Sequence, residues 1–443
     1  MLTASQETSR DAWARVDIRR AVGLCALAFV LLATYAVARP VSESLFLKEY
    51  TSKALPTVWM VVAAVALGVV ALYNRYASWM PMLQLFGWVS VGSGLLVWGL
   101  IGLHIAGVRA GTFALYVWKD VYIVVLVEIF WGYANQVFDL RKARWLYGLF
   151  CVMGSLGGLV ANLGVGPMAR WWGTAHTAYL LVPMLVGMGL AVWALVRWVG
   201  HEPTASAASQ GYSQKADTEA SAETPHTGAS LQTTTAEASS KKAAWGDGFG
   251  VVWRSSYLWL VFLLILCSQI ATNSLDYQYN QMLEKTYPNT DQRTAVVGQV
   301  YAIIDVVSMV FQFSTGLILR FVGVSATLLV IPVTLLVALC GFFVVPTFGM
   351  IAFAKIFDKS MGYSLFRAAK ELLYLPLSHE EKTQGKAVVD VFSYRAAKGF
   401  ASLLLLFLVY WQWSRWLGTI TALLLCAWLV LTFAIVRRYR SVG

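Results

Sequence analysis

Long apolar stretches alternate with short polar connections along almost the whole chain. Each stretch is long enough to cross, as a helix, a hydrocarbon core of about 30 Å. A spanning helix satisfies all its backbone hydrogen bonds internally, so the pattern predicts an all-α polytopic membrane protein. The twelve predicted spans lie at 21–39, 55–73, 81–104, 112–137, 145–167, 178–199, 255–277, 295–319, 323–345, 348–375, 388–411 and 416–436.

One polar segment interrupts this alternation in the middle of the chain. Residues 200–242 are rich in Ser, Thr, Ala, Glu and Gln and contain no Val, Ile, Phe or Trp. Such a segment cannot bury enough apolar surface to fold, and 200–250 is predicted to be a disordered cytoplasmic linker. The linker separates two halves of six helices, which is the plan of the major facilitator architecture. The predicted units are a cytoplasmic tail at 1–20, halves at 21–199 and 251–436, and a second cytoplasmic tail at 437–443.

Composition and charge support a membrane location and argue against nucleic-acid binding. The chain has 443 residues, of which 58% are hydrophobic and 13% charged, whereas soluble domains carry about 25% charged residues. The net charge is +11, but the Lys and Arg residues gather mostly in the short segments between spans. This bias predicts a multi-pass protein of the cell (inner) membrane with both termini in the cytoplasm. The lipid bilayer is therefore an expected partner, and nucleic acid is not.

The sequence lacks the motifs of an enzyme. No HExxH or GxSxG pattern occurs, and Gly385-Lys386-Ala387 lacks the first glycine and the Ser/Thr of a phosphate-binding loop. The five histidines lie at span ends or in loops, and the five cysteines lie inside apolar spans as packing residues. No catalytic residue, metal site or cofactor is predicted. A transporter of this kind must take its energy from a gradient or from exchange.

Several predicted spans carry ionisable residues. Each costs roughly 2.5–3.5 kcal/mol near the centre of a membrane helix, so it is expected to face a partner or a wet cavity. At 100° per residue, Lys355, Lys359 and Lys370 fall on one face of the tenth span. The seventh span has a polar stripe containing Asp276, and the eighth has another with Asp305, Ser308 and Gln312. Either these stripes line a central anion-binding cavity, or they form hydrogen bonds that hold the bundle together.

Short motifs in both halves resemble one family, the nucleotide transporters of plastids and intracellular bacteria known as ATP/ADP translocases. The resemblance runs from Arg39 to about Phe400, and the ordered set between 363 and 399 is its most specific part. The motifs are Phe130-Trp-Gly-Tyr-Ala-Asn-Gln136, Ala143-Arg-Trp-Leu-Tyr-Gly-Leu-Phe150, Tyr363-Ser-Leu-Phe366, Lys370-Glu371, Tyr374-Leu-Pro-Leu377, Gly385-Lys-Ala387, Asp390-Val391 and Lys398-Gly399.

The resemblance implies a twelve-helix carrier that exchanges nucleotides, with buried bases on the first and eleventh helices and acids on the fourth and seventh. Lys398 and Asp276 stand where such a base and acid are expected. Ser42 occupies the place of a usual lysine, and Lys119 with Asp120 stands near the usual acid of the fourth span.

The sequence as a whole predicts a secondary transporter that exchanges ATP, ADP or related phosphorylated anions by alternating access. A proton-coupled facilitator for another organic anion and a non-transporting protein with a carrier fold remain as alternatives, and the sequence leaves the oligomeric state open. The predicted substrate-binding residues are Arg39, Lys119, Asp120, Asn135, Asp276, Lys359, Lys370 and Lys398.

Overall fold

The computed structural model describes residues 4–76, 80–138, 140–199, 250, 252–374, 377, 389 and 393–442. Every regular element in these ranges is helical. Nine of the described helices are long and apolar enough to cross a membrane. The other three predicted spans correspond to a helix that carries several charges (α4, Arg109–Val137), to two helices separated by a π-helix (α13, Phe348–Met361, and α14, Arg367–Leu373) and to a shorter apolar helix (α15, Ser393–Tyr410).

The N-terminal half contains one helix for each of its predicted spans, with the sixth span divided in two. The chain changes direction between α5 and α6 at Gly173. The φ angle of this residue is 81°, a backbone conformation that is strained for residues with a side chain. Its helices are α1 (Ala4–Tyr50), α2 (Leu55–Tyr76), α3 (Met82–Ile105), α4 (Arg109–Val137), α5 (Leu140–Trp172), α6 (Thr174–Ala178) and α7 (Leu181–Val199).

The C-terminal half repeats this plan. Two of its helices begin at capping side chains: Ser255 accepts a hydrogen bond from the Leu258 amide, and Asn289 accepts from the Asp291 and Gln292 amides. Its helices are α10 (Ser256–Thr286), α11 (Thr290–Phe321), α12 (Gly323–Val344), α13 (Phe348–Met361), the π-helix η2 (Gly362–Phe366), α14 (Arg367–Leu373), α15 (Ser393–Tyr410) and α16 (Leu417–Val442).

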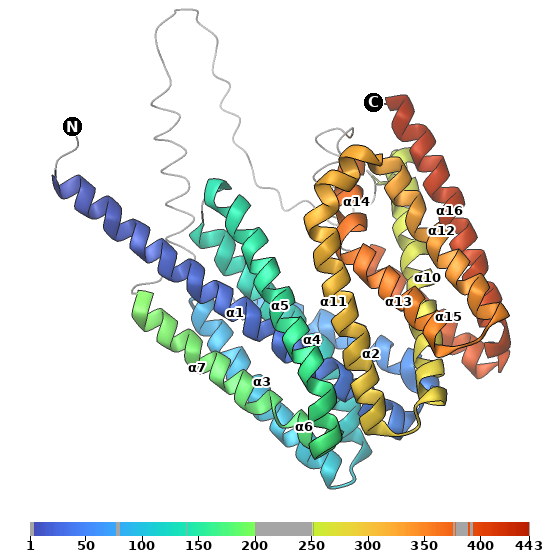
Figure 1. Ribbon diagram of the computed structural model, residues 1–443, viewed down its shortest axis with the longest axis horizontal. Coiled ribbons are helices and arrows are strands. Elements are labelled where there is room, and N and C mark those ends of the chain that lie inside the picture. The colour runs from blue at the N-terminus through green and yellow to red at the C-terminus, as the bar shows by residue number, and fades with distance from the viewer. Residues whose placement is uncertain are drawn as a thin grey trace, which may run out of the picture.

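The two halves lie side by side (Figure 1). One apolar core lies within the N-terminal half, and the other fills the C-terminal half and extends onto α1, α2 and α4. They touch mainly where α5 packs on α11 and where α2 packs on α15. Glycines allow the first of these contacts to be close, since a Cβ at Gly298 would lie 2.9 Å from the Asn162 carbonyl oxygen. The predicted all-α architecture of two six-helix halves is therefore confirmed.

Three differences from the predicted boundaries matter. Helix α1 continues through Pro40 to Tyr50, whereas the first span was predicted to end at residue 39. It also begins at Ala4, inside the predicted N-terminal tail. The tenth span is not one continuous α-helix, because η2 interrupts it. The predicted linker at 200–250, apart from residue 250, and the motif at Gly385-Lys386 lie outside the described residues.

The halves are joined by polar contacts at the end of the molecule opposite the start of α1 and the end of α16. There the Asp291 carboxylate accepts hydrogen bonds from the Thr174 amide and hydroxyl, both at 2.7 Å. Glu284 accepts from the Ser52 amide at 2.8 Å. Arg293, which is 3% exposed, donates to the Ser44 carbonyl oxygen at 3.4 Å. We call this set of contacts the seal.

Candidate functional site

A large cavity lies between the halves, on the side of the seal that carries the start of α1 and the end of α16. Its volume is about 1440 Å³, which exceeds the roughly 300–1,000 Å³ of common small-molecule pockets. Helices of both halves line it, chiefly α1, α4 and α5 on one side and α10, α11 and α13 on the other. Its charged lining residues are Arg39, Asp305, Asp358, Lys359 and Lys370.

Arg39 lies between two aromatic rings from different halves. Its guanidinium carbon is 4.2 Å from the ring centre of Tyr35, one turn earlier on α1, and 4.2 Å from that of Tyr301 on α11. Such stacking suits the planar guanidinium, whose donors match the oxygens of a carboxylate or phosphate. The two rings therefore hold the Arg39 guanidinium in place within the cavity.

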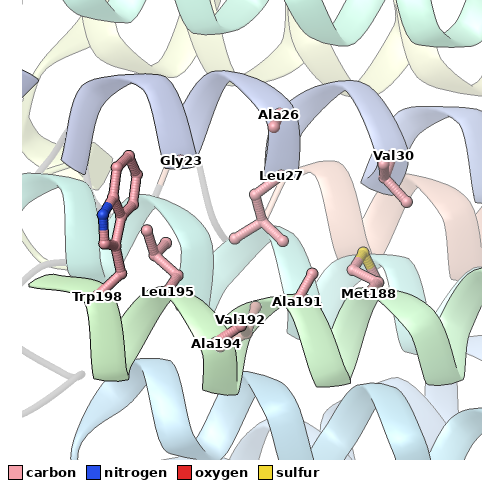
Figure 2. A pocket seen from close by; sticks show the side chains of 10 residues that line it. All are labelled: Gly23, Ala26, Leu27, Val30, Met188, Ala191, Val192, Ala194, Leu195 and Trp198. Carbon is pink, nitrogen blue, oxygen red and sulfur yellow. The ribbon is translucent and has the colours of Figure 1, made fainter. Parts of the chain in front are cut away.

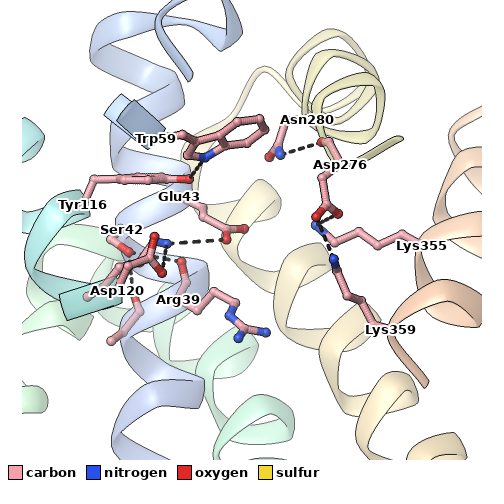
Figure 3. Close-up of polar contacts among 12 residues, drawn as sticks. Arg39, Ser42, Glu43, Trp59, Tyr116, Asp120, Asp276, Asn280, Lys355 and Lys359 are labelled. Atoms are coloured by element: carbon pink, nitrogen blue, oxygen red, sulfur yellow. Dashed lines mark hydrogen bonds and ion pairs between the residues drawn. The ribbon is translucent and has the colours of Figure 1, made fainter. Parts of the chain in front are cut away.

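Asp276 on α10 organises the basic groups of the C-terminal half (Figure 3). Its carboxylate oxygens lie 2.8 Å from Lys359 Nζ and 3.5 Å from Lys355 Nζ. Lys359 is also 3.4 Å from the Asp358 carboxylate, while Lys355 Nζ is 3.9 Å from the ring centre of Tyr279. We call this set the C-cluster. The Lys359 side chain is 22% exposed and that of Lys355 only 4%, so Lys359 is the base that a cavity ligand can reach.

A second ionic group, the N-cluster, lies in the N-terminal half (Figure 3). Lys119 Nζ is 3.0 Å from Asp120 and 4.0 Å from Glu43. It also lies 4.0 Å from the ring centre of Tyr116, whose hydroxyl accepts a hydrogen bond from the Trp59 indole at 2.9 Å. Lys119 is 2% exposed and is not part of the cavity lining. The N-cluster is thus a buried ionic network beside the cavity.

The remaining predicted site residues lie in different places. Lys370 on α14 lines the cavity and is buried. Lys398 on α15 is half-buried and close enough for its charge to act on Asp120, but it is not among the lining residues. Asn135 is exposed near the end of α4, where its side-chain oxygen accepts a hydrogen bond from the Tyr147 hydroxyl at 2.5 Å. The structure brings Arg39, Lys359 and Lys370 to one cavity and leaves Asn135 outside it.

The predicted residue set omitted Glu43 and the pair formed by Asn162 and Asp305. Glu43 follows Pro40, where the predicted span had ended, yet it continues the helix face of Arg39 four residues on. Asp305 was predicted on a polar strip that also contained Ser308 and Gln312, and all three line the cavity. Nothing in the sequence singles out Asn162.

A smaller cavity of about 370 Å³ lies between α1 and α7 (Figure 2). Only apolar side chains and Gly23 line it, including Leu27, Met188, Leu195 and Trp198. Its lining contains no charged side chain. The charged cavity between the halves is therefore the candidate site.

Solved structures resemble the whole chain in fold. A mutant form of the nucleoside transporter NupG superposes with a TM-score of 0.69 at 10% identity, and covers 94% of this chain and 99% of NupG. A bacterial homologue of the iron transporter ferroportin, in its inward-facing state, gives a TM-score of 0.66 at 11% identity, over 95% of this chain and 98% of that protein. These structures show a major-facilitator-type fold for this chain.

Curated relatives match much of the chain. "ADP,ATP carrier protein 1" of Chlamydia muridarum is 28% identical over 347 residues, which is 69% of this chain and 60% of that protein. The chloroplastic "ADP,ATP carrier protein 1" of Arabidopsis thaliana is 23% identical over 376 residues, 76% of this chain and 56% of that protein. The chain thus spans about 60% of the length of the Chlamydia relative.

The family model of the TLC ATP/ADP transporters matches residues 95–353 and 344–439. Together these segments include most of both halves. The family is one of transporters, in agreement with the absence of enzyme motifs from the sequence. The chain belongs to the TLC ATP/ADP transporter family.

Proposed function

We propose that this protein exchanges nucleotides, or closely related phosphorylated anions, across the cell membrane. The observation that carries the proposal is the basic set formed by Arg39, Lys359 and Lys370 around one cavity between the two halves. Charge-assisted hydrogen bonds from such groups are the strong contacts that recognise phosphate. The names of the related carriers from Chlamydia and Arabidopsis support ADP and ATP as first substrates to test.

In this proposal the phosphates contact Arg39 and Lys359, with Lys370 nearer the cytoplasmic end. Trp131 lines the same cavity and packs edge-on against Tyr147, with ring centres 5.1 Å apart. Its ring offers a face for a nucleobase. Lys398 does not line the cavity, but it lies close enough to Asp120 for its positive charge to act on that carboxylate.

The binding of an anion must compete with acids that already neutralise the cavity bases. Asp276 and Asp358 pair with Lys359 in the C-cluster. A phosphate that approaches Lys359 therefore exchanges one anionic partner for another, which avoids leaving an uncompensated charge at membrane depth. When no substrate is bound, the two acids compensate the charge of Lys359, so the empty carrier can reorient to its starting conformation.

Transport then requires the cavity to become accessible from the other side. The seal would open and the halves would close over the present cavity, as alternating access demands. Both ends of the described chain lie on the cavity side of the seal, and the Lys/Arg bias of the loops supports a cytoplasmic location for that side. The present arrangement would accordingly be the form that loads from the cytoplasm.

The test is a counterflow screen in proteoliposomes with internal unlabelled substrate and external labelled substrate. We expect counterflow with nucleoside triphosphates or diphosphates, and none with the matching nucleosides. Liposomes without protein provide the baseline. Counterflow of another organic anion but of no nucleotide would contradict the proposal, and the absence of counterflow with every substrate would favour a non-transporting protein.

A further inference from the structure

Asp305 and Asn162 face each other where the two halves meet. Asp305 is on α11, Asn162 is on α5, and both line the cavity. The Asn162 amide nitrogen donates a hydrogen bond to Asp305 Oδ2 at 2.8 Å. Gly158, one turn before Asn162, leaves room for the carboxyl group, since a Cβ at that position would lie 3.1 Å from Oδ2. The pair thus joins the halves through one hydrogen bond at the edge of the cavity.

Only one of the two polar groups of the Asn162 side chain is hydrogen-bonded in this contact. Asn162 is 5% exposed, and its side-chain oxygen is buried without a hydrogen-bond partner in the described structure. An ionised carboxylate has no hydrogen to offer that oxygen, because it can only accept. A protonated Asp305 could donate its O–H to the Asn162 oxygen while it still accepts from the amide nitrogen. A carboxylic acid and a carboxamide then form two parallel hydrogen bonds in place of one.

Asp305 also differs from the other acids of the cavity in its neighbours. Asp358 and Asp276 pair with lysines, whereas Asp305 forms no ion pair within the described residues. The other charged groups that line the cavity are Arg39 from α1, Asp358 and Lys359 from α13 and Lys370 from α14. Of these, Arg39 acts electrostatically on Asp305 while it is stacked between Tyr35 and Tyr301.

From this geometry we propose that Asp305 and Asn162 form a proton-binding site that couples a proton to the motion of the two halves. The proposal deepens the transport function proposed above and rests on it for its physiological meaning. A proton from the water in the cavity binds a carboxylate oxygen of Asp305, and the acid–amide pair then holds α5 against α11. When that proton leaves, the second hydrogen bond is lost and the negative carboxylate faces the buried, unpaired oxygen of Asn162. This repulsion favours separation of the two helices at this point.

The first test needs no substrate. Spin labels on full-length protein without its native cysteines would report the distance between Trp198→Cys at the end of α7 and Phe321→Cys at the end of α11, both of which are exposed positions. We expect the distance distribution of the otherwise unaltered protein to change between mildly acidic and mildly alkaline buffer. Asp305→Asn should abolish this change, and Asp305→Glu should keep it with a different midpoint. Glu128→Gln, an exposed acid outside the cavity lining, is the matched control and should behave like the parent protein.

The second test measures net uptake with and without an imposed pH gradient. One proton per substrate permits roughly tenfold accumulation per unit of pH difference. Asp305→Asn should lose this gradient-driven accumulation and retain counterflow, in which both crossings are loaded. A pH response that survives in Asp305→Asn would overturn the proton site. Failure of all nucleotide counterflow with an intact, Asp305-dependent conformational response would overturn the nucleotide assignment and leave the proton site standing.

Discussion

The N-cluster and the C-cluster contain the same kinds of groups but differ in their access to the cavity. Each pairs lysine with carboxylates and stacks a lysine on a tyrosine ring. Lys119 of the N-cluster is 2% exposed and outside the cavity lining, whereas the Lys359 side chain is 22% exposed and within it. Equivalent chemistry in the two halves thus supports two roles, a buried network in one half and a ligand-accessible base in the other.

The largest effect that would test this comparison is on stability. Lys119→Met leaves the buried Glu43 and the partly buried Asp120 without their shared base. Breaking a buried ion pair in this way costs about 3–5 kcal/mol. We expect a marked fall in the yield of folded protein and in its thermal midpoint, measured by size-exclusion chromatography after heating in detergent.

The double variant Lys119→Met with Asp120→Asn removes one of the stranded charges and should recover part of the loss. Lys359→Met, in the more exposed cluster, is the matched comparison and should lose much less. If Lys119→Met were as stable as the unaltered protein, the N-cluster would have no structural role.

The next effect concerns substrate binding at the C-cluster. Lys359→Gln keeps a hydrogen-bond donor but removes the charge, and hydrogen bonds to charged groups contribute roughly 1.5–3 kcal/mol. We therefore expect triphosphate affinity to fall roughly ten- to hundredfold, with little change for the corresponding nucleoside. Equilibrium binding of labelled nucleotide to protein in nanodiscs measures this.

Lys285→Gln, at an exposed position at the end of α10, is the control for a general loss of positive charge. An equal loss of affinity for the triphosphate and the nucleoside in Lys359→Gln would mean that Lys359 shapes the cavity without contacting phosphate.

The sequence predicted the scaffold well because apolar length alone decides which segments can cross a bilayer. It also placed Lys355, Lys359 and Asp276 on polar helix faces, but their pairing depends on how α10 and α13 pack, which no local pattern encodes. The π-helix η2 changes the number of residues per turn beyond Met361, so a constant step of 100° no longer describes the tenth span. Lys370 nevertheless lines the same cavity as Lys359.

The predicted end of the first span shows a second limit. Membrane helices tolerate proline where neighbouring groups satisfy the backbone, and α1 continues through Pro40 to Tyr50. Glu43 therefore lies on the helix of Arg39 but beyond the predicted end of the span at residue 39. Asn162 could not have been found at all, because its significance comes from Asp305, more than a hundred residues away in the chain.

A third effect separates the two steps of transport at the C-cluster. Asp276→Asn keeps the shape of the residue but removes the anion that holds Lys355 and Lys359. Anion binding should remain or become tighter, because the cavity is more positive. Return of the empty carrier should slow, since Lys355 then loses its paired acid and Lys359 loses one of its acid partners. We expect net efflux to fall by about fivefold or more, roughly 1 kcal/mol in barrier height, while exchange changes less.

Efflux into substrate-free medium and exchange against external substrate, measured on the same proteoliposomes, give the two rates. Equal reduction of both rates together with weaker binding would make Asp276 a direct substrate ligand, and its role as a counter-charge would be wrong.

The smallest effect tests Arg39, which bridges the halves by stacking on Tyr35 of α1 and Tyr301 of α11. Arg39→Lys keeps the charge but loses the planar group, and such stacking contributes about 0.5–1 kcal/mol at partly exposed sites. We expect affinity for a triphosphate to fall about two- to fivefold. Tyr301→Leu should reproduce most of this loss, because it removes one ring and leaves the guanidinium. If Arg39 acts only through its charge, Arg39→Lys and Tyr301→Leu will both bind like the unaltered protein, whereas Arg39→Gln will not. A loss in Arg39→Lys that the tyrosine variant does not share would instead assign the effect to the forked contact between the guanidinium and phosphate.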